Sequence, residues 1–421
     1  MKAARFLVCL ALASSLAASS RAASQALHIV DGANRPGTDF LTIQEAVDAA
    51  AAHDTIVIRR GEYLEEVTLG GKALTVTAQV ADRRTHWRSW QTSGYEPEDT
   101  VVDSLTITGS DAGDPVVVRG LRVRGGLGGT TAPSGPGVLV QACAGPVLLE
   151  RITVLDRIDI RDHYGEVMGV LVQDSDAVIM AGVMVAGSRD SSTGPRLQVE
   201  RSTVSLFDSY IWGTLRNLLE SHVTARVIDA DVFASGSWIE AETPSPWNPN
   251  GPECYAGDSG LETLGNSSVT LLDTLVVGTE SPFPLHCWVP GVDGEDFLGL
   301  MPDVIDTRAR HLVLEGPRHA GVTTTLTLTG EPGDLVFTVL AASPGHQINA
   351  GFLSGPVVLS LPQANEFVGV IPADRRLTFN RTPNLPPGFG SHSFPMQAVF
   401  VDWPAREFVM SRPSVLTIYQ P

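Results

Sequence analysis

Six segments of this chain share one ten-residue alternation of apolar and polar positions. In every segment the first position is Val or Ala, the third is Val, Leu or Met, and the eighth is Val or Ile. Because successive side chains of a strand point to opposite faces, this alternation predicts short strands with one buried face. The segments are VVVRGLRVRG (116–125), VLLERITVLD (147–156), VIMAGVMVAG (178–187), VSLFDSYIWG (204–213), ARVIDADVFA (225–234) and VTLLDTLVVG (269–278).

The fifth position of this pattern interrupts each strand. It holds Gly, Arg or Asp, and both Gly and Asp tolerate the positive φ angle of a sharp bend better than most residues. Segments that recur every 20–50 residues or so are typical of stacked units that bury one continuous core. The chain is therefore predicted to be all-β, with a right-handed parallel β-helix whose coils stack about 4.8 Å apart.

A second polar column lies a few positions before the apolar segments. It consists of Gln141, Gln173, Glu200 and Glu220. Amide and carboxylate side chains that stack at one turn of the coil would form a ladder along the β-helix. The interpretation of this column is structural.

The segment before the first coils predicts a short helix and a first strand. Thr42 is placed to cap a helix, with Glu45 three residues on. Ile43, Ala46, Val47 and Ala50 give that helix one apolar face. The segment DFLTIQEAVDAAAAHDTIVIRRGEYLEEV (39–67) resembles the N-terminal part of pectin-lyase-like β-helix proteins, including the pectinesterases. This resemblance implies a secreted bacterial protein of the β-helix fold, with the helix capping its open end, and it implies no particular activity.

The last third of the chain has a different pattern. After about residue 305 the ten-residue alternation stops, and short β-rich segments separated by Gly and Pro turns follow. Such spacing is typical of a β-sandwich-like module. The predicted organisation is a signal peptide over 1–26, a β-helix over 27–304 and the module over 305–421.

The N-terminus carries the pattern of a secretory signal. A basic start (MKAAR) precedes an apolar run and then small residues, so cleavage is expected after Ala22 or Ala26. The mature protein is then expected to be secreted, periplasmic or at the cell surface, where a disulfide can form. Cys254 and Cys287 flank one loop-rich stretch and are predicted to pair, whereas Cys143 is expected to be a buried thiol.

The charge of the chain excludes two classes of partner. The formal net charge of the 421 residues is −18, and binding to phosphate requires clustered Lys and Arg. Nucleic acid and anionic membranes are therefore not expected partners. After the signal, no stretch is long and apolar enough to predict membrane insertion.

The bends of the last three segments supply the first candidate site. Asp208, Asp229 and Asp273 occupy the fifth position, and direct stacking of their coils would bring the three carboxylates together. Neighbouring carboxylates share a proton or hold a hard cation such as Ca²⁺. The competing interpretation is that each Asp bends the chain and binds local N–H groups.

The second candidate is the charged insert DRIDIRDHYGE (156–166). Its acids, bases and arginines could serve a lyase or hydrolase site on the flank of the β-helix, or they could form a solvated loop. The catalytic candidates in it are Asp159, Arg161, Asp162, His163 and Glu166.

Known catalytic patterns of this fold do not occur in the sequence. The GTVDFIFG-like segment of pectinesterases is missing, and no metal, nucleotide or cofactor motif appears, so no cofactor other than Ca²⁺ is suggested. The first hypothesis is an exported β-helix protein that binds polysaccharide or has a structural or adhesive role without catalysis. The alternative is a divergent lyase, glycoside hydrolase or esterase that acts on uronic-acid polymers. Whether the chain is an enzyme, and how many copies assemble, is left open.

Overall fold

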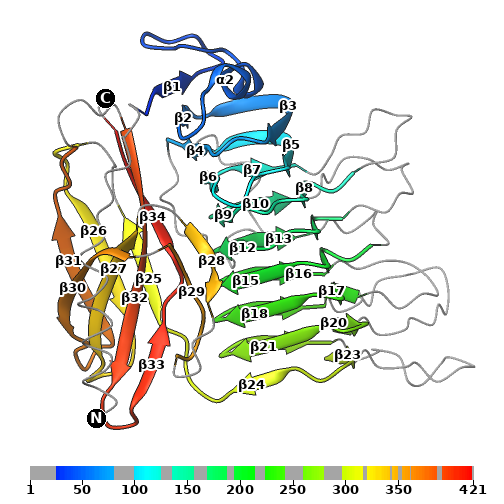
Figure 1. Ribbon diagram of the computed structural model, residues 1–421, viewed down its shortest axis with the longest axis vertical. Coiled ribbons are helices and arrows are strands. Elements are labelled where there is room, and N and C mark those ends of the chain that lie inside the picture. The colour runs from blue at the N-terminus through cyan, green and yellow to red at the C-terminus, as the bar shows by residue number, and fades with distance from the viewer. Residues whose placement is uncertain are drawn as a thin grey trace, which may run out of the picture.

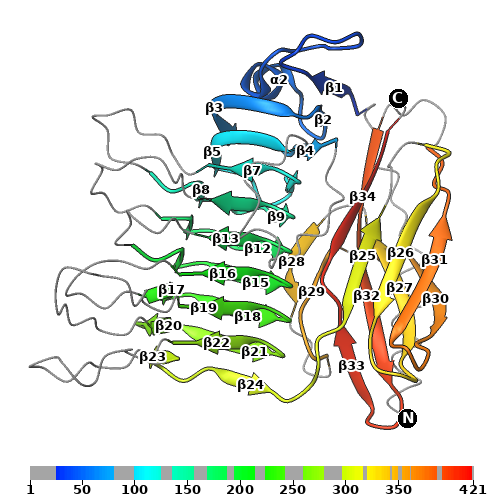
Figure 2. The ribbon, with the colours of Figure 1, turned by 180° about the vertical axis from the view of Figure 1, so that it is seen from behind.

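The computed structural model describes a stack of parallel β-coils with an antiparallel module beside it (Figures 1 and 2). The described residues are 25–79, 99–124, 135–155, 168–186, 194–213, 223–241, 259–278, 296–315, 320–341, 344–348, 353–360, 362–385 and 391–419.

A short helix lies at the N-terminal end of the stack. Helix α2 (Ile43–Ala49) begins after Thr42, whose Oγ1 accepts a hydrogen bond from the N–H of Glu45 at 3.3 Å. The helix buries Ile43 and Val47 against the first strands. Those strands are β1 (Leu27–Val30), β2 (Thr55–Ile58), β3 (Gly61–Gly70), β4 (Thr75–Ala78) and β5 (Thr100–Thr108).

One flank of the stack is a ten-stranded parallel sheet. It begins with β1, β2 and β4, and each later coil adds one strand in register with the previous one. The later strands are β6 (Val116–Arg119), β9 (Val147–Glu150), β12 (Val178–Ala181), β15 (Thr203–Phe207), β18 (Asp231–Ser235), β21 (Ser268–Leu272) and β24 (Asp303–Ile305).

A fourteen-stranded sheet forms the other flanks as two arms that meet at β5, which also pairs with β3. The first arm holds β7 (Arg122–Val123), β10 (Thr153–Leu155), β13 (Met184–Ala186), β16 (Tyr210–Trp212), β19 (Trp238–Glu240) and β22 (Leu275–Val277). The second arm holds β8 (Val138–Gln141), β11 (Val170–Gln173), β14 (Leu197–Glu200), β17 (Val223–Ile228), β20 (Ser259–Leu264) and β23 (Phe297–Gly299).

The core of the stack is built from like residues placed on top of one another. Val147, Val178, Val204, Val232 and Val269 follow one another in register, and all five are buried in a single apolar cluster. Because every coil repeats the same inward positions, the apolar pattern of the sequence predicts this core well.

The register corrects the fifth predicted copy of the pattern. Residues 225–228 lie in β17 of the second arm, whereas Val232 of β18 pairs with Val204 and Val269. The true fifth copy therefore begins at Val232 and bends at Gly236. The two corners of each coil share the same alternation around a bend residue, so periodicity alone does not distinguish them.

Residues at these corners form two columns with positive φ, between +45° and +72°. The first bend column, between the ten-stranded sheet and the first arm, holds Gly120, Arg151, Gly182, Asp208, Gly236 and Asp273. The second bend column follows the second arm and holds Gly71, Gly109, Ala142, Asp174, Arg201, Asp229 and Gly265. The bends expected at the fifth position are therefore confirmed.

A hydroxyl side chain after the bend satisfies the backbone of the neighbouring coil. Ser209 Oγ accepts from the N–H of Val183 at 3.2 Å and donates to the carbonyl of Phe207 at 3.0 Å. Ser237 Oγ repeats this role for the N–H of Ser209 at 3.1 Å. In the second column Cys143 occupies the equivalent place, as the buried free thiol that the sequence predicts. Buried backbone N–H groups at the corners thus donate hydrogen bonds to side-chain oxygens, outside the regular pairing of the strands.

The C-terminal residues form antiparallel sheets beside the ten-stranded sheet. Strands β25 (His311–Glu315), β26 (Thr324–Thr329) and β31 (Arg376–Arg381) make one sheet. A second sheet consists of β30 (Pro362–Val370), β27 (Leu335–Ala341), β32 (Ser391–Asp402), β33 (Glu407–Met410) and β34 (Ser414–Tyr419). A two-stranded sheet pairs β28 (Pro344–Ile348) with β29 (Val357–Leu359).

The module and the stack share one apolar cluster. Phe207, Phe233 and Leu272 point outward from the ten-stranded sheet and are buried together with module residues such as Leu312 and Phe400. Burial of this kind stabilises association by about 25 cal/mol per Å² of apolar surface. The stack and the module are therefore packed as one body through this face.

Two glycines with positive φ allow a test of the bend column at this boundary. A Cβ built on Gly236 (φ +58°) would lie 2.8 Å from Asp208 Oδ1 and 3.0 Å from the Cβ of Ala309. A Cβ on Gly109 (φ +64°) would meet nothing within 4 Å. Both substitutions to Ala are expected to cost about 1–2 kcal/mol from backbone strain. Gly236→Ala should lower the free energy of unfolding by roughly a further 1–3 kcal/mol through crowding.

The measurement is guanidinium unfolding of the wild type, Gly236→Ala and the control Gly109→Ala. Equal losses for the two variants would contradict the close packing at the boundary.

Candidate functional site

A row of amide and carboxylate side chains crosses the second arm. Gln141, Gln173 and Glu200 end β8, β11 and β14 and pair in direct register. Gln141 Nε2 donates to Gln173 Oε1 at 3.4 Å, and Gln173 Nε2 donates to Glu200 Oε2 at 2.7 Å. The polar ladder that the sequence predicts is thus confirmed for these three residues. Glu220 lies outside the described residues, and Ile228 pairs with Glu200 on the next coil.

The bends that follow this row add two charged groups. Arg201 Nε donates to Asp174 Oδ1 at 2.6 Å, and its Nη2 donates to Asp174 Oδ2 at 3.1 Å. Its Nη1 lies 3.6 Å from Glu200 Oε2. One guanidinium group therefore joins the carboxylates of two neighbouring coils, with the two-pronged geometry that suits Arg.

A second polar column runs beside the first. Gln198, Arg226 and Glu262 follow one another in register, two residues before the column of Glu200. Gln198 Nε2 donates to Glu200 Oε1, and Arg226 Nε donates to Glu262 Oε2 at 2.5 Å. We call the whole set the polar face. It consists of Gln141, Gln173, Asp174, Gln198, Glu200, Arg201, Arg226 and Glu262.

The electrostatics of the polar face keep one carboxylate ionised. The hydrogen bonds and charge of Arg201 hold the pKa of Asp174 below its usual range. The same pair raises the pKa of Arg201. Asp174 is therefore ionised at neutral pH, where it accepts hydrogen bonds and does not act as an acid.

Sequence reasoning found only part of the polar face. The related strands VLVQ (138–141), VLVQ (170–173) and LQVE (197–200) carried a signal for its first column. Asp174 and Arg201 were missed because they fall on bends, where a charged residue resembles an ordinary turn. Arg226 was missed because its strand was assigned to the wrong corner of the coil.

The three aspartates predicted as one carboxylate column do not form one. Asp208 and Asp273 lie in the first bend column with the coil of Gly236 between them, and Asp229 lies in the second. Asp273 Oδ2 accepts from the N–H of Ala309 at 3.0 Å, and Asp229 Oδ1 accepts from the N–H of Asn266 at 2.9 Å. Within the described residues no three His, Cys, Asp or Glu side chains gather closely enough to hold a metal ion.

Two other predicted groups lie outside the described residues. The charged insert with Asp159, Arg161, Asp162, His163 and Glu166 falls in residues 156–167. Cys254 and Cys287 fall in 242–258 and 279–295. Their catalytic role and their disulfide stay predictions.

Asp208 belongs to a charged cluster at the boundary with the module. His311 Nδ1 donates to Asp208 Oδ1 at 2.6 Å, and Arg412 Nη1 donates to Asp208 Oδ2 at 3.3 Å. Burial would raise the pKa of Asp208, but the charges of His311 and Arg412 and their hydrogen bonds lower it. The charge of Asp208 raises the pKa of His311 above its ordinary value, against the effect of burial. This cluster fastens the module to the stack.

A buried carboxylate supports the same boundary. Glu150 Oε1 accepts from Ser414 Oγ at 2.7 Å, and Oε2 accepts from the N–H of Val415 at 3.1 Å. Arg119 Nε lies 3.2 Å from the same carboxylate. Burial would raise the pKa of Glu150, and the charges of Arg119, Arg151 and Arg412 lower it. Removal of one partner would leave a buried charge, which makes this pair a structural element.

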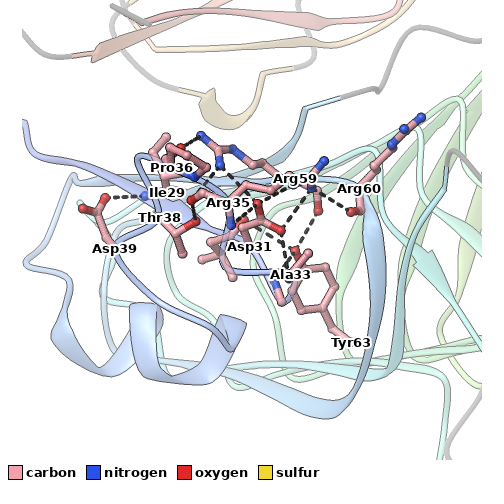
Figure 3. Close-up of polar contacts among 12 residues, drawn as sticks. Ile29, Asp31, Ala33, Arg35, Pro36, Thr38, Asp39, Arg59, Arg60 and Tyr63 are labelled. Carbon is pink, nitrogen blue, oxygen red and sulfur yellow. Dashed lines mark hydrogen bonds and ion pairs between the residues drawn. The ribbon is translucent and has the colours of Figure 1, made fainter.

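A third charged group holds the loop before the helix (Figure 3). Asp31 accepts from Arg35 Nε at 2.7 Å, from Arg59 Nη1 at 3.1 Å and from the N–H of Ala33 at 3.0 Å. Tyr63 Oη donates to the carbonyl of Arg59 at 2.8 Å. The hydrogen bonds from Arg35 hold the pKa of Asp31 well below its usual range. Because its oxygens are already used by the loop, Asp31 acts as a clamp and does not offer a binding site.

Comparisons with known proteins add little to this geometry. No protein-family model matches the chain, and no curated protein matches it. Among solved structures, a crystal structure of pectin methylesterase in complex with a hexasaccharide matches 61% of this chain and 83% of its own length. The identity is 11% and the TM-score is 0.27, so the likeness carries no argument about function. The part of the chain that the structure describes holds no helix of the length and apolarity needed to span a bilayer.

The boundary cluster predicts a pH dependence of stability. A His whose pKa is raised on folding stabilises the folded state fully below its ordinary pKa of about 6.5 and loses this contribution as the pH rises through its folded-state pKa. We expect the free energy of unfolding of the wild type, relative to His311→Asn, to fall as the pH rises from about 6.5 through the raised pKa of His311.

Chemical unfolding of both proteins across this pH range is the measurement. A constant difference between wild type and His311→Asn would contradict a charged His311 at the boundary.

Proposed function

We propose that this protein binds polysaccharide on the polar face of its β-helix. The carrying observation is the placement of three amides, two carboxylates and one guanidinium group in register on adjacent strands of one arm, with Asp174 and Arg201 on the bends that follow. Such groups are the donors and acceptors that recognise sugar hydroxyl groups. The buried centre of a protein–protein interface, by contrast, contains few charged residues, so the polar face does not resemble one.

The repeat of the coils supports an extended ligand. Strands of neighbouring coils lie about 4.8 Å apart, so the polar side chains repeat at close to the length of one sugar unit. Gln141, Gln173 and Glu200 would then each meet a successive unit of a chain that runs along the stack. A single small molecule would use only one of these positions.

The charges of the polar face favour a neutral glycan over a uronic-acid polymer. Arg201 is engaged by Asp174 and Glu200, and Arg226 is engaged by Glu262. Three carboxylates against two guanidinium groups leave a net charge of −1 on the face, within a chain of formal charge −18. An anionic polymer would be repelled by this surface unless a cation lay between them.

The proposal includes export of the protein. The basic and apolar pattern of residues 1–26 supports a secretory signal, and polysaccharides of the cell surface and its surroundings would then be accessible.

Binding is tested by isothermal calorimetry after the purified chain has been screened against neutral and uronic-acid oligosaccharides. Gln173→Ala and Glu200→Gln should each weaken binding of the best ligand about tenfold, because each removes a hydrogen bond of roughly 1.5 kcal/mol to a sugar. Glu45→Gln makes the same chemical change on α2 and should leave the affinity unaltered. Unchanged affinity in both polar-face variants would contradict this site.

A second candidate function is hydrolysis at the same place, and the pairing of Asp174 with Glu200 around Arg201 favours it. Two neighbouring carboxyl groups can divide the roles of base and acid in the addition of water to a glycosidic or ester bond. Asp174, which Arg201 keeps ionised, would take a proton from the attacking water while its oxygen bonds to the sugar or acyl carbon. The bond to the leaving oxygen would break as that oxygen receives a proton from the carboxyl group of Glu200.

The release of reducing sugar or of ester-derived acid from the bound glycan distinguishes the two functions. Hydrolysis predicts that Asp174→Asn abolishes release while binding persists. Absence of release by the wild type would leave binding as the function.

A further inference from the structure

The strands of the polar face also carry apolar side chains on their outer surface. Val138 and Val140 of β8 belong to the buried core, so the alternation of the strand directs Leu139 and Gln141 outward. The same alternation places one apolar and one polar side chain outward on β11, β17 and β20. The outward pairs are Leu139 and Gln141, Leu171 and Gln173, Arg226 and Ile228, and Glu262 and Leu264.

The register gathers these apolar side chains into two short columns. Leu139 pairs with Leu171 on one side of the polar face, and Ile228 pairs with Leu264 on the other side. Between the two columns, both outward residues of β14 are polar. The polar groups therefore cross the face diagonally, and each half of the face has an apolar column beside its polar one.

We propose that the glycan of the polar face consists of pyranose units whose ring hydroxyl groups are all equatorial, with each ring lying flat over an apolar side chain. This inference rests on the proposed binding function. In such a unit the hydroxyl groups project from the rim of the ring, and C–H bonds cover its two faces. The rim then meets the polar column while a face covers the apolar one.

The dimensions of the first half agree with this placement. Outward residues two positions apart on a strand lie about 6.6 Å apart, which is comparable with the width of one ring. A ring over Leu171 therefore brings a rim hydroxyl group to Gln173, and the next ring does the same over Leu139 at Gln141. Gln173 donates one of its two N–H groups to Glu200 Oε2 at 2.7 Å, and the amide has a second N–H for a hydroxyl group.

The second half offers the same combination with a charged donor. A ring over Ile228 meets Arg226, which lies two positions earlier on the same strand. Arg226 Nε donates to Glu262 Oε2 at 2.5 Å, and a guanidinium group has further N–H donors for rim hydroxyl groups.

Other ligands fit this mixed face less well. A wholly apolar partner would bury the groups of Glu200 and Arg226 without new hydrogen bonds, which is costly. An axial hydroxyl group would project from the face of the ring onto Leu171 or Ile228 and would lose its water without gaining a partner. The face therefore selects sugar units by the orientation of their hydroxyl groups.

Calorimetric titration of the purified chain with two matched hexasaccharides tests the inference. Both are β-1,4-linked; one is built from glucose, whose ring hydroxyl groups are all equatorial, and the other from mannose, whose hydroxyl group at C2 is axial. The glucose hexasaccharide should bind about tenfold more tightly, because the mannose units bury unpaired hydroxyl groups.

Two variants locate the origin of this preference. Leu171→Asn places a polar side chain beneath the ring and should weaken binding of the glucose hexasaccharide about tenfold while changing that of the mannose hexasaccharide less. Ile228→Thr is a milder change in the second apolar column and should reduce the preference in the same direction, whether or not Leu171→Asn folds. The matched control is Leu64→Asn, since Leu64 is 64% exposed on β3 and lies outside the polar face.

The outcomes separate this inference from the function on which it rests. Equal affinity for the two hexasaccharides, or a preference for mannose, would overturn the inference and leave polysaccharide binding in place. Equal effects of Leu171→Asn, Ile228→Thr and the control Leu64→Asn would also overturn it. Failure of every glycan to bind would contradict the proposed function itself, and this inference with it.

Discussion

Parallel stacking of coils in register is the constraint on which the rest of this structure depends. Each strand forms its hydrogen bonds with the coils before and after it, so the same position of every coil lies over its equivalent. Apolar residues gain from this arrangement because the inward Val column is continuous. Polar residues on the outer face are forced together in the same way. Glu200 therefore lies beside Gln173 of the previous coil, and its carboxylate interacts with Gln173 and Arg201. The polar face is a direct result of the stacking.

The same constraint explains the different character of the flanks and ends of the stack. The ten-stranded sheet carries Phe207 and Phe233 outward and is covered by the module. The second arm carries amides and charges outward, and none of the described module strands pairs with it. The binding site is proposed on this second arm because most of its groups are positioned by strands, which preserve the geometry of a binding site better than loops do.

The sequence is a good guide to the stack because each coil repeats a local pattern. Alternating apolar residues and bend residues identified the strands and the positive-φ corners, and the capping pair Thr42 and Glu45 identified the helix. The fifth segment was wrong in register, because Asp229 and Gly236 lie at two different corners that look alike in sequence. The order of corners is a property of the whole coil, and a ten-residue pattern does not contain it.

The boundary and the candidate site were harder to foresee, for a physical reason. Asp208 meets His311 and Arg412, which lie more than one hundred residues away in the chain. Nothing near Asp208 in the sequence distinguishes this pairing from a metal site or a simple bend. Glu150 likewise ends an ordinary strand pattern, and its role follows only from contact with Ser414.

The central claim is that the polar face holds a polysaccharide, and a crystal structure of the complex tests it most directly. The crystals would contain the oligosaccharide that binds most tightly in solution. The account predicts sugar density along Gln141, Gln173 and Glu200, with successive units beside successive coils. Density confined to the module or to the first arm would contradict it.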